Sequence, residues 1–435
     1  MKKVKLGEIL TFQRGYDLPS QYRNEGEYPI ISSSGISGTH NDYRCDGSNV
    51  ITGRYGTIGD VYYYNGKCWP LNTALFISDF KGNYPLYIYY FLKTVLKVDG
   101  KDKSTVPGVN RNVLHQMNVS YHENVDIQKS ISYILLSLDN KIELNNKINK
   151  ELEAMAKELY DYWFVQFDFP DRNGKPYKSS GGKMEWNEQL KRNIPKNWCI
   201  ENITEATSLQ YGFPFDTDFF NDKQHGVPII RIRDILENSI GIYSTEKYID
   251  KKYELFSGDL LIGMDGNFHI NHWFLNNCYL NQRVVRLRKK DLSTFVIKFQ
   301  IEPAIKQKES VGSGSTVSHL NDNDVKSMCI LIPSNDYLSE VNLQFDNILH
   351  KILKTQFENQ TLSQLRDFLL PLLMSGQVTI KDVEGKVENI ISFTDKSSKD
   401  QRFKLWLSKQ KTAARGELDR QTLREIFDAM DEDDK

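Results

Sequence analysis

A long stripe of mostly apolar residues runs between residues 131 and 163. Its members recur at alternating spacings of four and three, which is typical of the buried seam of a coiled coil. They are Ile131, Leu135, Leu138, Ile142, Asn145, Asn149, Leu152, Ala156, Leu159 and Trp163. The two asparagines lie mid-seam, where a buried polar residue lowers stability but fixes register and partner. The pattern predicts a helix over residues 126–165, roughly 55 Å long at about 1.5 Å per residue.

A second stripe of this kind lies near the end of the chain. It contains Val341, Phe345, Ile348 and Ile352, and then, after a phase shift, Leu362, Leu365, Leu369 and Leu372. Pro371 and Gly376 favour the end of this helix. A single solvated helix would not present so regular an apolar stripe. We therefore expect the second helical segment, residues 338–380, to pack antiparallel against the first.

Short runs of β-branched and aromatic residues fill the segments that precede the two helices. Examples are residues 61–64 and 284–287, and clusters of Gly, Asn and Asp separate such runs. This pattern is typical of strands joined by tight turns. Residues 86–92 form a longer apolar run that we interpret as a buried helix. Each segment is therefore expected to be a compact mixed domain of strands and helices.

The two strand-rich segments repeat each other. Four matches occur in the same order with drifting offsets: residues 28–31 with 227–230, 47–51 with 258–262, 71–72 with 280–281, and 104–106 with 315–317. We infer two copies of one unit, the first head (residues 1–125) and the second head (residues 198–337). Chance similarity between two sheet domains is the alternative. The predicted fold class is α+β, with two homologous mixed domains separated by two long antiparallel coiled-coil helices in a pseudo-twofold arrangement.

Composition limits the classes to which the chain can belong. Of its 435 residues, 39% are hydrophobic and 12% aromatic, which excludes disorder over the whole length. A net charge of −1 excludes a uniformly basic nucleic-acid coat. No apolar run approaches about 18 residues and the first residues are polar, so we expect neither a membrane span nor a signal peptide. The odd, scattered set of cysteines suggests reduced thiols in the cytoplasm: Cys45, Cys68, Cys199, Cys278 and Cys329.

The common catalytic motifs are missing from the sequence. Residues 181–184 (Gly-Gly-Lys-Met) lack the hydroxyl residue of a phosphate-binding loop, and no Pro-Pro dipeptide is present for an amino-methyltransferase motif. No acidic-x-Lys triplet follows residues 170–171 within the next two dozen residues to complete a nuclease site. His269, His272 and Cys278 could ligate zinc, but we favour a polar loop in a sheet domain, because tetrahedral sites usually show tighter pairs. We therefore predict no catalytic residue, metal or cofactor in this chain.

Two related heads on a stiff helix pair suit a polymer that presents two sites at a fixed distance, above all duplex DNA. A separation of roughly 40–55 Å corresponds to about 12–16 base pairs at ~3.4 Å per pair. Because the heads are related but not identical, we expect two different half-sites. A protein-binding coiled-coil scaffold without DNA, and a self-contained DNA modification enzyme with unrecognised motifs, are the alternatives.

Four segments of the chain resemble a known family. They are residues 163–170 (Trp-Phe-Val-Gln-Phe-Asp-Phe-Pro), 173–184 (Asn-Gly-Lys-Pro-Tyr-Lys-Ser-Ser-Gly-Gly-Lys-Met), 194–198 (Ile-Pro-Lys-Asn-Trp) and 365–376 (Leu-Arg-Asp-Phe-Leu-Leu-Pro-Leu-Leu-Met-Ser-Gly). The first three resemble the central connector, and the start of the second copy, in specificity subunits of Type I restriction–modification enzymes. The fourth resembles the end of that family's second conserved helix. The resemblance spans roughly residues 1–380, and the heads match only in outline.

The resemblance implies a DNA-specificity subunit without catalytic activity. The heads would be target-recognition domains, residues 126–165 and 338–380 the conserved coiled-coil helices, and residues 166–197 the connector. Two modification subunits, which bind S-adenosylmethionine and methylate adenine, would dock on the helices and the adjoining head surfaces. Restriction subunits that use ATP and magnesium would join through them. Residues 381–435 lie beyond the resemblance, and we interpret them as a loosely ordered tail or as a docking element for another subunit.

Candidate DNA-binding residues are polar or basic side chains near the repeated loops, because bases are read in the grooves while Lys, Arg and hydroxyl groups hold phosphates. In the first head they are Gln13, Arg14, Tyr16, Arg54, Tyr55, Lys101, Lys103, Ser104, Thr105 and Arg111. In the second head they are Gln210, Tyr211, Arg231, Arg233, Asn267, His269, Lys306, Lys308, Ser313, Ser315 and Thr316. For each one, the alternative is a solvated charge or a turn hydroxyl.

Removing the charge at Lys103 or Arg111 should weaken binding to every DNA sequence and flatten its salt dependence. The reason is that a phosphate contact releases condensed counterions whatever base lies beside it. A salt titration of duplex binding measures both effects, and unchanged affinity across that titration would refute the assignment.

Overall fold

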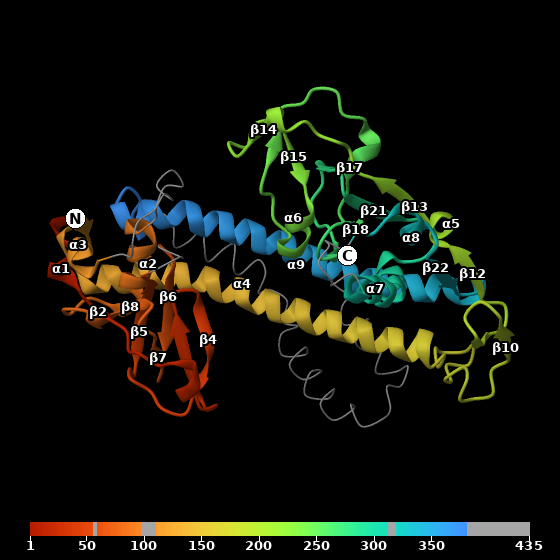
Figure 1. The fold of residues 1–435 in the computed structure, drawn as a ribbon, viewed down its shortest axis with the longest axis horizontal. Helices are drawn as coiled ribbons and strands as arrows, with labels where there is room; N and C mark the ends of the chain where they lie inside the picture. The colour runs from red at the N-terminus through yellow and green to blue at the C-terminus, as the bar shows by residue number, and fades with distance from the viewer. Residues whose placement is uncertain (55–58, 97–109, 312–318, 381–435) are drawn as a thin grey trace. The chain divides into compact units, whose positions relative to one another are not determined.

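The computed structural model describes residues 1–54, 59–96, 110–311 and 319–380 (Figure 1). Its contacts divide into two compact units. Among the described residues, unit 1 holds 1–142 and 361–380, and unit 2 holds 143–360. Each long helix therefore contributes one part to each unit. Within the described ranges, no helix is both long and apolar enough to cross a membrane.

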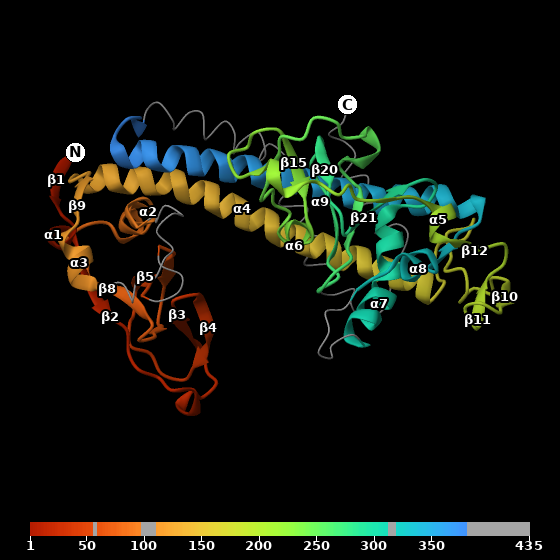
Figure 2. The ribbon, with the colours of Figure 1, turned by 45° about the horizontal axis from the view of Figure 1, so that its top comes forward.

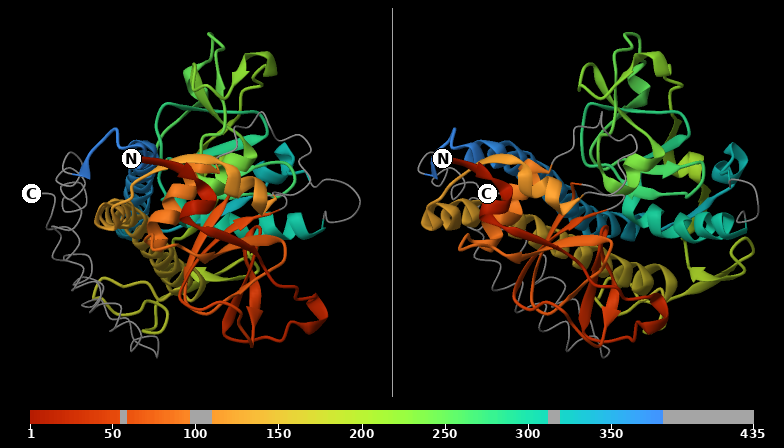
Figure 3. Two further views of the ribbon diagram at one scale, coloured as in Figure 1. Left: turned by 90° about the vertical axis from the view of Figure 1, so that its left-hand side faces the viewer. Right: turned by 60° about the vertical axis from the view of Figure 1, so that its left-hand side comes forward.

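Unit 1 contains two sheets and a strand pair, drawn in red and orange in Figure 3. The central sheet has the order β2-β8-β5-β6 with antiparallel neighbours: β2 (Thr11–Arg14), β8 (Ala74–Asp79), β5 (Ser48–Gly53) and β6 (Val61–Asn65). The second sheet has the order β4-β3-β7: β4 (Gly35–His40), β3 (Tyr28–Ser32) and β7 (Trp69–Pro70). The strand pair is β1 (Lys2–Lys5) with β9 (Asn118–Tyr121), and the short helices are α1 (Leu6–Ile9), a 3-10 turn (Ser20–Tyr22), α2 (Pro85–Val95) and α3 (Arg111–Gln116).

Unit 2 repeats this arrangement. Its central sheet has the order β13-β21-β18-β19: β13 (Thr207–Tyr211), β21 (Val284–Lys289), β18 (Leu260–Gly263) and β19 (Ile270–His272). Its second sheet has the order β14-β16-β15-β20-β17: β14 (Phe220–Asn221), β16 (Tyr243–Ser244), β15 (Val227–Ile230), β20 (Cys278–Leu280) and β17 (Glu254–Leu255). The parallel strands β15 and β20 lie side by side in Figure 2.

The remaining elements of unit 2 follow unit 1 in part, since the helix Ile232–Glu237 and the 3-10 turn Lys251–Tyr253 have no counterpart among the described elements of unit 1. These remaining elements are the strand pair β12 (Cys199–Asn202) with β22 (Cys329–Ile332), the helices α5 (Ile203–Ala206), α6 (Ile232–Glu237), α7 (Thr294–Val311) and α8 (Asp322–Lys326), and 3-10 turns at Thr217–Phe219 and Lys251–Tyr253. The predicted strands at 61–64 and 284–287 and the predicted buried helix at 86–92 are confirmed as β6, β21 and α2. The predicted α+β class with two repeated domains is likewise confirmed by the matching strand orders.

The register of the repeat differs by one residue from two of the sequence matches. The N–H of Leu71 donates to the Ile31 carbonyl (2.8 Å), and the N–H of Asn281 donates to the Ile230 carbonyl (3.2 Å). Leu71 therefore corresponds to Asn281, and the predicted match with Leu280 was wrong. The match of residues 47–51 with 258–262 slips in the same way, because Gly53 faces Ala74 and Gly263 faces Val284. The register of a strand is set by which of its side chains face the core. Because neighbouring positions of the two copies carry similar residue types, a sequence match displaced by one residue is not apparent from the sequence.

Each central sheet is buried on both faces, and this explains its nearly continuous apolar strands. In unit 1, Val50 points into the cluster formed with α2 and the long helices, whereas Ile51 points into the cluster shared with the second sheet. Leu260 and Leu261 divide in the same way in unit 2. Alternate residues of one strand thus serve two cores, and a slip of one residue would exchange them.

The two long helices are α4 (Val125–Tyr160), which continues through a π-helical turn (Asp161–Val165), and α9 (Asn335–Ser375). In unit 1 their side chains share one core, with Leu135 and Leu369 buried together and Arg366 Nη1 2.8 Å from Asp139 Oδ1. Pro371 lies inside the last turn of α9 and does not end it. Gly376 follows the last helical residue with a φ of +70°, the left-handed conformation that commonly terminates a helix.

The same helices pair antiparallel in unit 2 through a polar layer. The buried Asn145 donates from Nδ2 to Glu358 Oε2 (3.0 Å) and to Asn359 Oδ1 (2.8 Å), and Asn149 accepts a hydrogen bond from Thr355. As the position on α4 rises from 145 to 149, the partner on α9 falls from 359 to 355, which shows the opposite directions of the two helices.

The residues of this polar layer fill the apparent gap in the seam of the second helix, so the helix has no phase shift there. The seam continues from Ile352 through Thr355 and Asn359 to Leu362 at the same alternating spacings, so the interpretation of a break was wrong. A search for apolar residues alone passes over polar seam positions. The predicted seam residues that the structure buries are Ile131, Leu135, Leu138, Asn145, Asn149, Leu152, Val341, Phe345, Ile348, Ile352, Leu362 and Leu369. Half-buried are Ile142, Leu159, Leu365 and Leu372, and Leu373 is buried in place of Leu372.

The connector after α4 packs as an aromatic cluster within unit 2. Trp163, Phe164, Phe167 and Phe169 are buried together with Trp198, and Phe169 stacks on Trp198 at 4.9 Å between ring centroids. A hairpin of β10 (Met184–Asn187) and β11 (Arg192–Pro195) completes the segment. Stacked and edge-on aromatic pairs each add about 0.5–1.5 kcal/mol beyond burial, so this segment is a packed joint.

Replacing Asn145 by alanine should destabilise unit 2 by about 1–3 kcal/mol, because two half-buried acceptors on α9 lose the hydrogen bonds that this buried side chain donates. The midpoint of urea unfolding, followed by circular dichroism, measures the loss. Lys147→Ala is the matched control, since Lys147 pairs with Glu143 on the exposed surface of the same helix. Equal midpoints for the two variants would contradict a stabilising role of the layer.

Candidate nucleic-acid interface

A hollow of about 490 Å³ in unit 2 gathers side chains from three loops. One wall is the start of α6, another is the loop between β18 and β19, and the third is the turn between β20 and β21. The lining residues are Arg231, Ile232, Arg233, Asp265, Asn267, His269, Asn281, Gln282 and Arg283. Four residues predicted as DNA readers, Arg231, Arg233, Asn267 and His269, are therefore brought together by the fold.

Two glycines allow these loops to approach one another. A Cβ on Gly212, just after β13, would lie 1.9 Å from the Asn281 carbonyl oxygen. A Cβ on Gly263, at the end of β18, would lie 2.8 Å from a methyl carbon of Ile232. Gly15 makes the corresponding approach in unit 1, where a Cβ would lie 2.1 Å from the Leu71 carbonyl oxygen. Glycine is needed at these places because any side chain would push the loops apart.

Two of the arginines at the hollow are already bound by carboxylates. Arg231 donates from Nε to Asp234 Oδ2 (2.9 Å) and from Nη2 to Asp234 Oδ1 (3.1 Å), and the Asp234 side chain is only 3% exposed. Arg283 lies 3.4 Å from Asp265, whose other oxygen is 2.7 Å from His319 Nδ1. A contact from Arg231 to DNA would require breaking a buried two-point ion pair, so this residue chiefly anchors α6.

The remaining polar groups of the hollow are exposed and available. Arg233, Asn267 and Gln282 are exposed, His269 is half-buried, and Arg233 has no ion-pair partner among the described residues. A guanidinium matches the acceptors of guanine or a phosphate, and the amides of Asn and Gln match the edge of adenine. The hollow can therefore read a base edge while holding a phosphate.

The corresponding place in unit 1 has different chemistry. By the register of the two sheets, Ser32 occupies the position of Arg231, and Arg54 occupies that of Met264. Ser34 follows in the tight turn between β3 and β4, where unit 2 instead forms the helix α6 that carries Arg233. The Ser32 and Ser34 hydroxyl oxygens lie 3.1 Å apart. Hydroxyl groups contact either phosphates or bases without a fixed charge. The Ser32 side chain is buried and its hydroxyl donates to the Gly35 carbonyl (3.0 Å), so the exposed hydroxyl in the first head is that of Ser34, whereas the second head exposes Arg233.

The other predicted DNA-binding residues are spread over both units. In unit 1, Gln13 and Arg14 lie in β2, and Tyr16 packs on Trp69 and Phe76. Arg54 follows β5, and the exposed Arg111 begins α3. In unit 2, Gln210 and Tyr211 lie in β13. On α7, Lys306 pairs with Glu302 (2.7 Å) and Lys308 with Asp324 (2.9 Å). Several predicted residues and segments lie outside the described residues. They are Tyr55, Lys101, Lys103, Ser104, Thr105, Ser313, Ser315, Thr316, the matched segments 104–106 and 315–317, and the tail 381–435.

Both heads place further residues at these surfaces that the sequence pattern did not single out. In the second head, Asn281, Gln282 and Arg283 line the hollow. In the first, the Arg44 guanidinium lies 4.7 Å from the Trp69 ring centroid, and the Lys67 ammonium lies 4.5 Å from that of Tyr43. The signal for the first-head residues was a basic residue adjacent to aromatic ones, a combination suited to phosphates and stacked bases.

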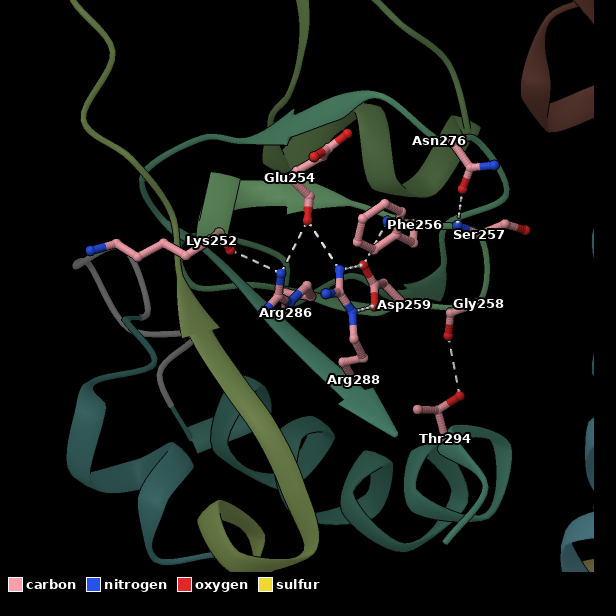
Figure 4. Close-up of polar contacts among 10 residues, drawn as sticks. All are labelled: Lys252, Glu254, Phe256, Ser257, Gly258, Asp259, Asn276, Arg286, Arg288 and Thr294. Atoms are coloured by element: carbon pink, nitrogen blue, oxygen red, sulfur yellow. Dashed lines mark hydrogen bonds and ion pairs between the residues drawn. The ribbon is translucent and has the colours of Figure 1, made fainter. Parts of the chain in front are cut away.

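A second arginine cluster in unit 2 is committed to internal contacts (Figure 4). Arg288 donates to both carboxylate oxygens of Asp259 at 2.7 Å, and Arg286 donates to the carbonyls of Lys252 (3.0 Å) and Glu254 (3.1 Å). Arg286 is 4% exposed, and burial lowers the pKa of its guanidinium. These donors tie β21 to the loop before β18, so they stabilise the head and are not free for DNA.

His272 and Cys278 lie in the core, and the predicted polar loop is wrong for both. His272 is 4% exposed on β19 with its ring 5.3 Å from that of Phe295, and Cys278 is 1% exposed on β20. His269 alone lies in a loop. In the part of the chain that the structure describes, no group of three potential metal ligands occurs. Burial holds the pKa of the His272 imidazole well below its usual range.

Comparisons with known proteins agree with this arrangement. The family model described as Type I restriction modification DNA specificity domain matches residues 1–154 and 195–366. The Type I restriction enzyme MjaIX specificity subunit of Methanocaldococcus jannaschii is 23% identical over 314 residues, which are 68% of this chain and 70% of the relative. The EcoBI specificity subunit of Escherichia coli is 26% identical over 204 residues, which are 45% of this chain and 43% of the relative.

A solved structure shows the same fold. The crystal structure of the S subunit of a Type-I restriction-modification system from M. genitalium matches with a TM-score of 0.52 and 14% identity, covering 86% of this chain and 96% of that one. At that identity the likeness is evidence for the fold alone.

Acidification should destabilise unit 2 through His272. The pKa of His272 is lower in the folded chain than in the unfolded chain, where it is about 6.5. Below that pH the unfolded chain binds a proton that the folded chain does not bind. The free energy of unfolding therefore falls as the pH is lowered, by at most about 1.4 kcal/mol per pH unit. Urea unfolding at pH 7.5, 6.5 and 5.5 measures this slope. His272→Leu should flatten it, whereas the exposed His225→Leu should not. Identical slopes for wild type and His272→Leu would contradict a buried neutral imidazole.

Proposed function

The chain belongs to the family of Type I restriction modification DNA specificity proteins, and from that premise we propose that its two heads read two different halves of one bipartite DNA target. It is a specificity subunit of a Type I restriction–modification system. The observation that carries the proposal is the repeated fold with unlike chemistry at equivalent places. Arg233, Asn267 and His269 line the second head's hollow, whereas the matching strand of the first head leads into a tight turn with the exposed Ser34.

An asymmetric target follows from this difference. Two identical heads would favour a palindrome, because equal surfaces select equal sequences. Here the second head offers a guanidinium and amides, while the first offers hydroxyl groups together with Arg44 and Lys67 on aromatic rings. The scaffold alternative accounts for the paired helices but not for exposed readers gathered on a repeated domain.

The partners in this proposal are duplex DNA and two modification subunits, with restriction subunits in the full complex. Exposed apolar side chains on the long helices support a docking role: Tyr133 and Leu144 on α4, and Leu343 and Phe368 on α9. In this scheme the partners bind S-adenosylmethionine, ATP and magnesium, and they methylate adenine, while this chain contributes recognition alone. The complex would act in the cytoplasm, where the DNA lies.

Selection from a random duplex library tests the function directly. The chain is purified with a co-expressed modification subunit, and bound duplexes are sequenced after several rounds of selection. We expect two short unlike sequences separated by a fixed number of unselected base pairs. Enrichment of a single palindrome, or of no sequence at all, would overturn the proposal.

Within that target, Arg233→Ala should weaken binding by about 1–3 kcal/mol, because an exposed guanidinium at the hollow loses its contact with DNA. Scrambling the half-site read by the second head should abolish the difference in affinity between Arg233→Ala and the wild type. Scrambling the other half-site should leave that difference unchanged. Arg172→Ala is the matched control, since Arg172 is an exposed arginine of the connector paired with Asp336 at 2.8 Å. Equal affinities for Arg233→Ala and Arg172→Ala would remove Arg233 from the interface.

A further inference from the structure

Two cysteines that are distant in the sequence face each other in the first head. Cys45 and Cys68 form an isolated antiparallel bridge next to the second sheet of unit 1. The N–H of Cys45 donates to the Cys68 carbonyl (3.1 Å), and the N–H of Cys68 donates to the Cys45 carbonyl (2.9 Å). They are therefore a hydrogen-bonded pair, with their side chains on the same face of the bridge.

This pairing suits a disulfide without movement of the backbone. Directly opposed residues of a hydrogen-bonded antiparallel pair have Cα atoms about 5.5 Å apart. Disulfides span Cα separations of roughly 4.4–6.8 Å, with the most frequent values near 5.5–6 Å. Both side chains pack in one cluster with Ile31, Ile51 and Phe76.

We propose that Cys45 and Cys68 are an oxidative modification site, at which a low-molecular-weight disulfide converts the two thiols into a reversible cross-strand disulfide. The site stands independently of DNA recognition, because it rests on the backbone pairing alone. The expectation of unpaired thiols rested on spacing along the chain, and a separation of 23 positions conceals a direct contact across the bridge.

The exchange proceeds in two steps that balance. Cys45 is half-buried and Cys68 is fully buried, so Cys45 reacts first. The Cys45 thiol loses its proton, its sulfur bonds to one sulfur of the small disulfide, and the other sulfur leaves as a thiolate that takes up a proton. Cys68 then attacks the Cys45 sulfur and releases the second small thiol. The cysteine pair loses two electrons, and the small disulfide is reduced to two thiols.

The surroundings keep the pair reduced under ordinary conditions. Burial raises the pKa of the Cys45 thiol to about 11 and that of Cys68 to about 12. Only the thiolate is nucleophilic, so at neutral pH both groups react slowly. Below these pKa values the thiolate fraction rises about tenfold per pH unit, and the rate of oxidation should rise in proportion.

The second head contains a built-in comparison. There β17 and β20 pair Leu255 with Cys278 in the position that Cys45 and Cys68 occupy in the first head. Cys278 is as buried as Cys68 but faces a leucine. The redox site therefore belongs to the first head, where a disulfide would tie the segment carrying Arg44 to β7 and its Trp69.

The experiment oxidises the full chain with glutathione disulfide at pH 8.5 and blocks remaining thiols with N-ethylmaleimide. Mass spectrometry of the intact chain and of its peptides follows. We expect neither Cys45 nor Cys68 to be blocked, with a peptide pair joined through these two residues and without glutathione on either. Cys278→Ala should leave that link intact, whereas Cys68→Ala should abolish it and leave glutathione on Cys45. Oxidation should be about tenfold slower at pH 7.5.

A gain of function provides the second arm. Leu255→Cys should create an additional link with Cys278 under the same conditions, because the backbone pairing is equivalent. The wild-type result does not depend on any variant folding. Five blocked thiols, or glutathione on Cys45 without a link to Cys68, would overturn the proposal. Links formed only between chains would do the same.

Discussion

The packing of α4 against α9 is the interaction on which both compact units depend. Each unit combines a head with one part of each helix, and the helix side chains enter the same core as the head's central sheet. Leu135 and Leu369 belong to one such core, and Phe345 and Ile352 to the other. Without the helices, one face of each sheet would lose its cover. The heads therefore fold on the helices and are not merely attached to them.

Polar groups within this packing select one arrangement among many apolar ones. Leucine seams can slide by a heptad at little change in burial, whereas Asn145 finds acceptors only opposite Glu358 and Asn359. Arg366 and Asp139 make a second pairing in unit 1. Register matters here because the position along each helix determines which residues meet each head.

The repeated heads show how one fold acquires two surfaces. Strand order, the close glycine contacts at Gly15 and Gly212, and the division of each central strand between two cores are common to both. The loops differ: the first head has a tight turn with the exposed Ser34 after β3, and the second head has the helix α6 with the exposed Arg233 after β15. Core positions are constrained by packing, but a loop side chain that points to solvent can change without cost to the sheet.

The sequence by itself determined the periodic features of this protein: the heptad seam, the repetition of two mixed domains and the connector motif. Such features depend on spacing along one chain, which a single sequence displays. Only the tertiary structure decided which charges are free. Arg231 and Arg233 look alike as letters, yet Asp234 binds the first and leaves the second exposed. The strand register, the polar seam positions and the meeting of Cys45 with Cys68 were also decided in space. Each depends on which backbone lies alongside, and spacing along the chain does not encode that.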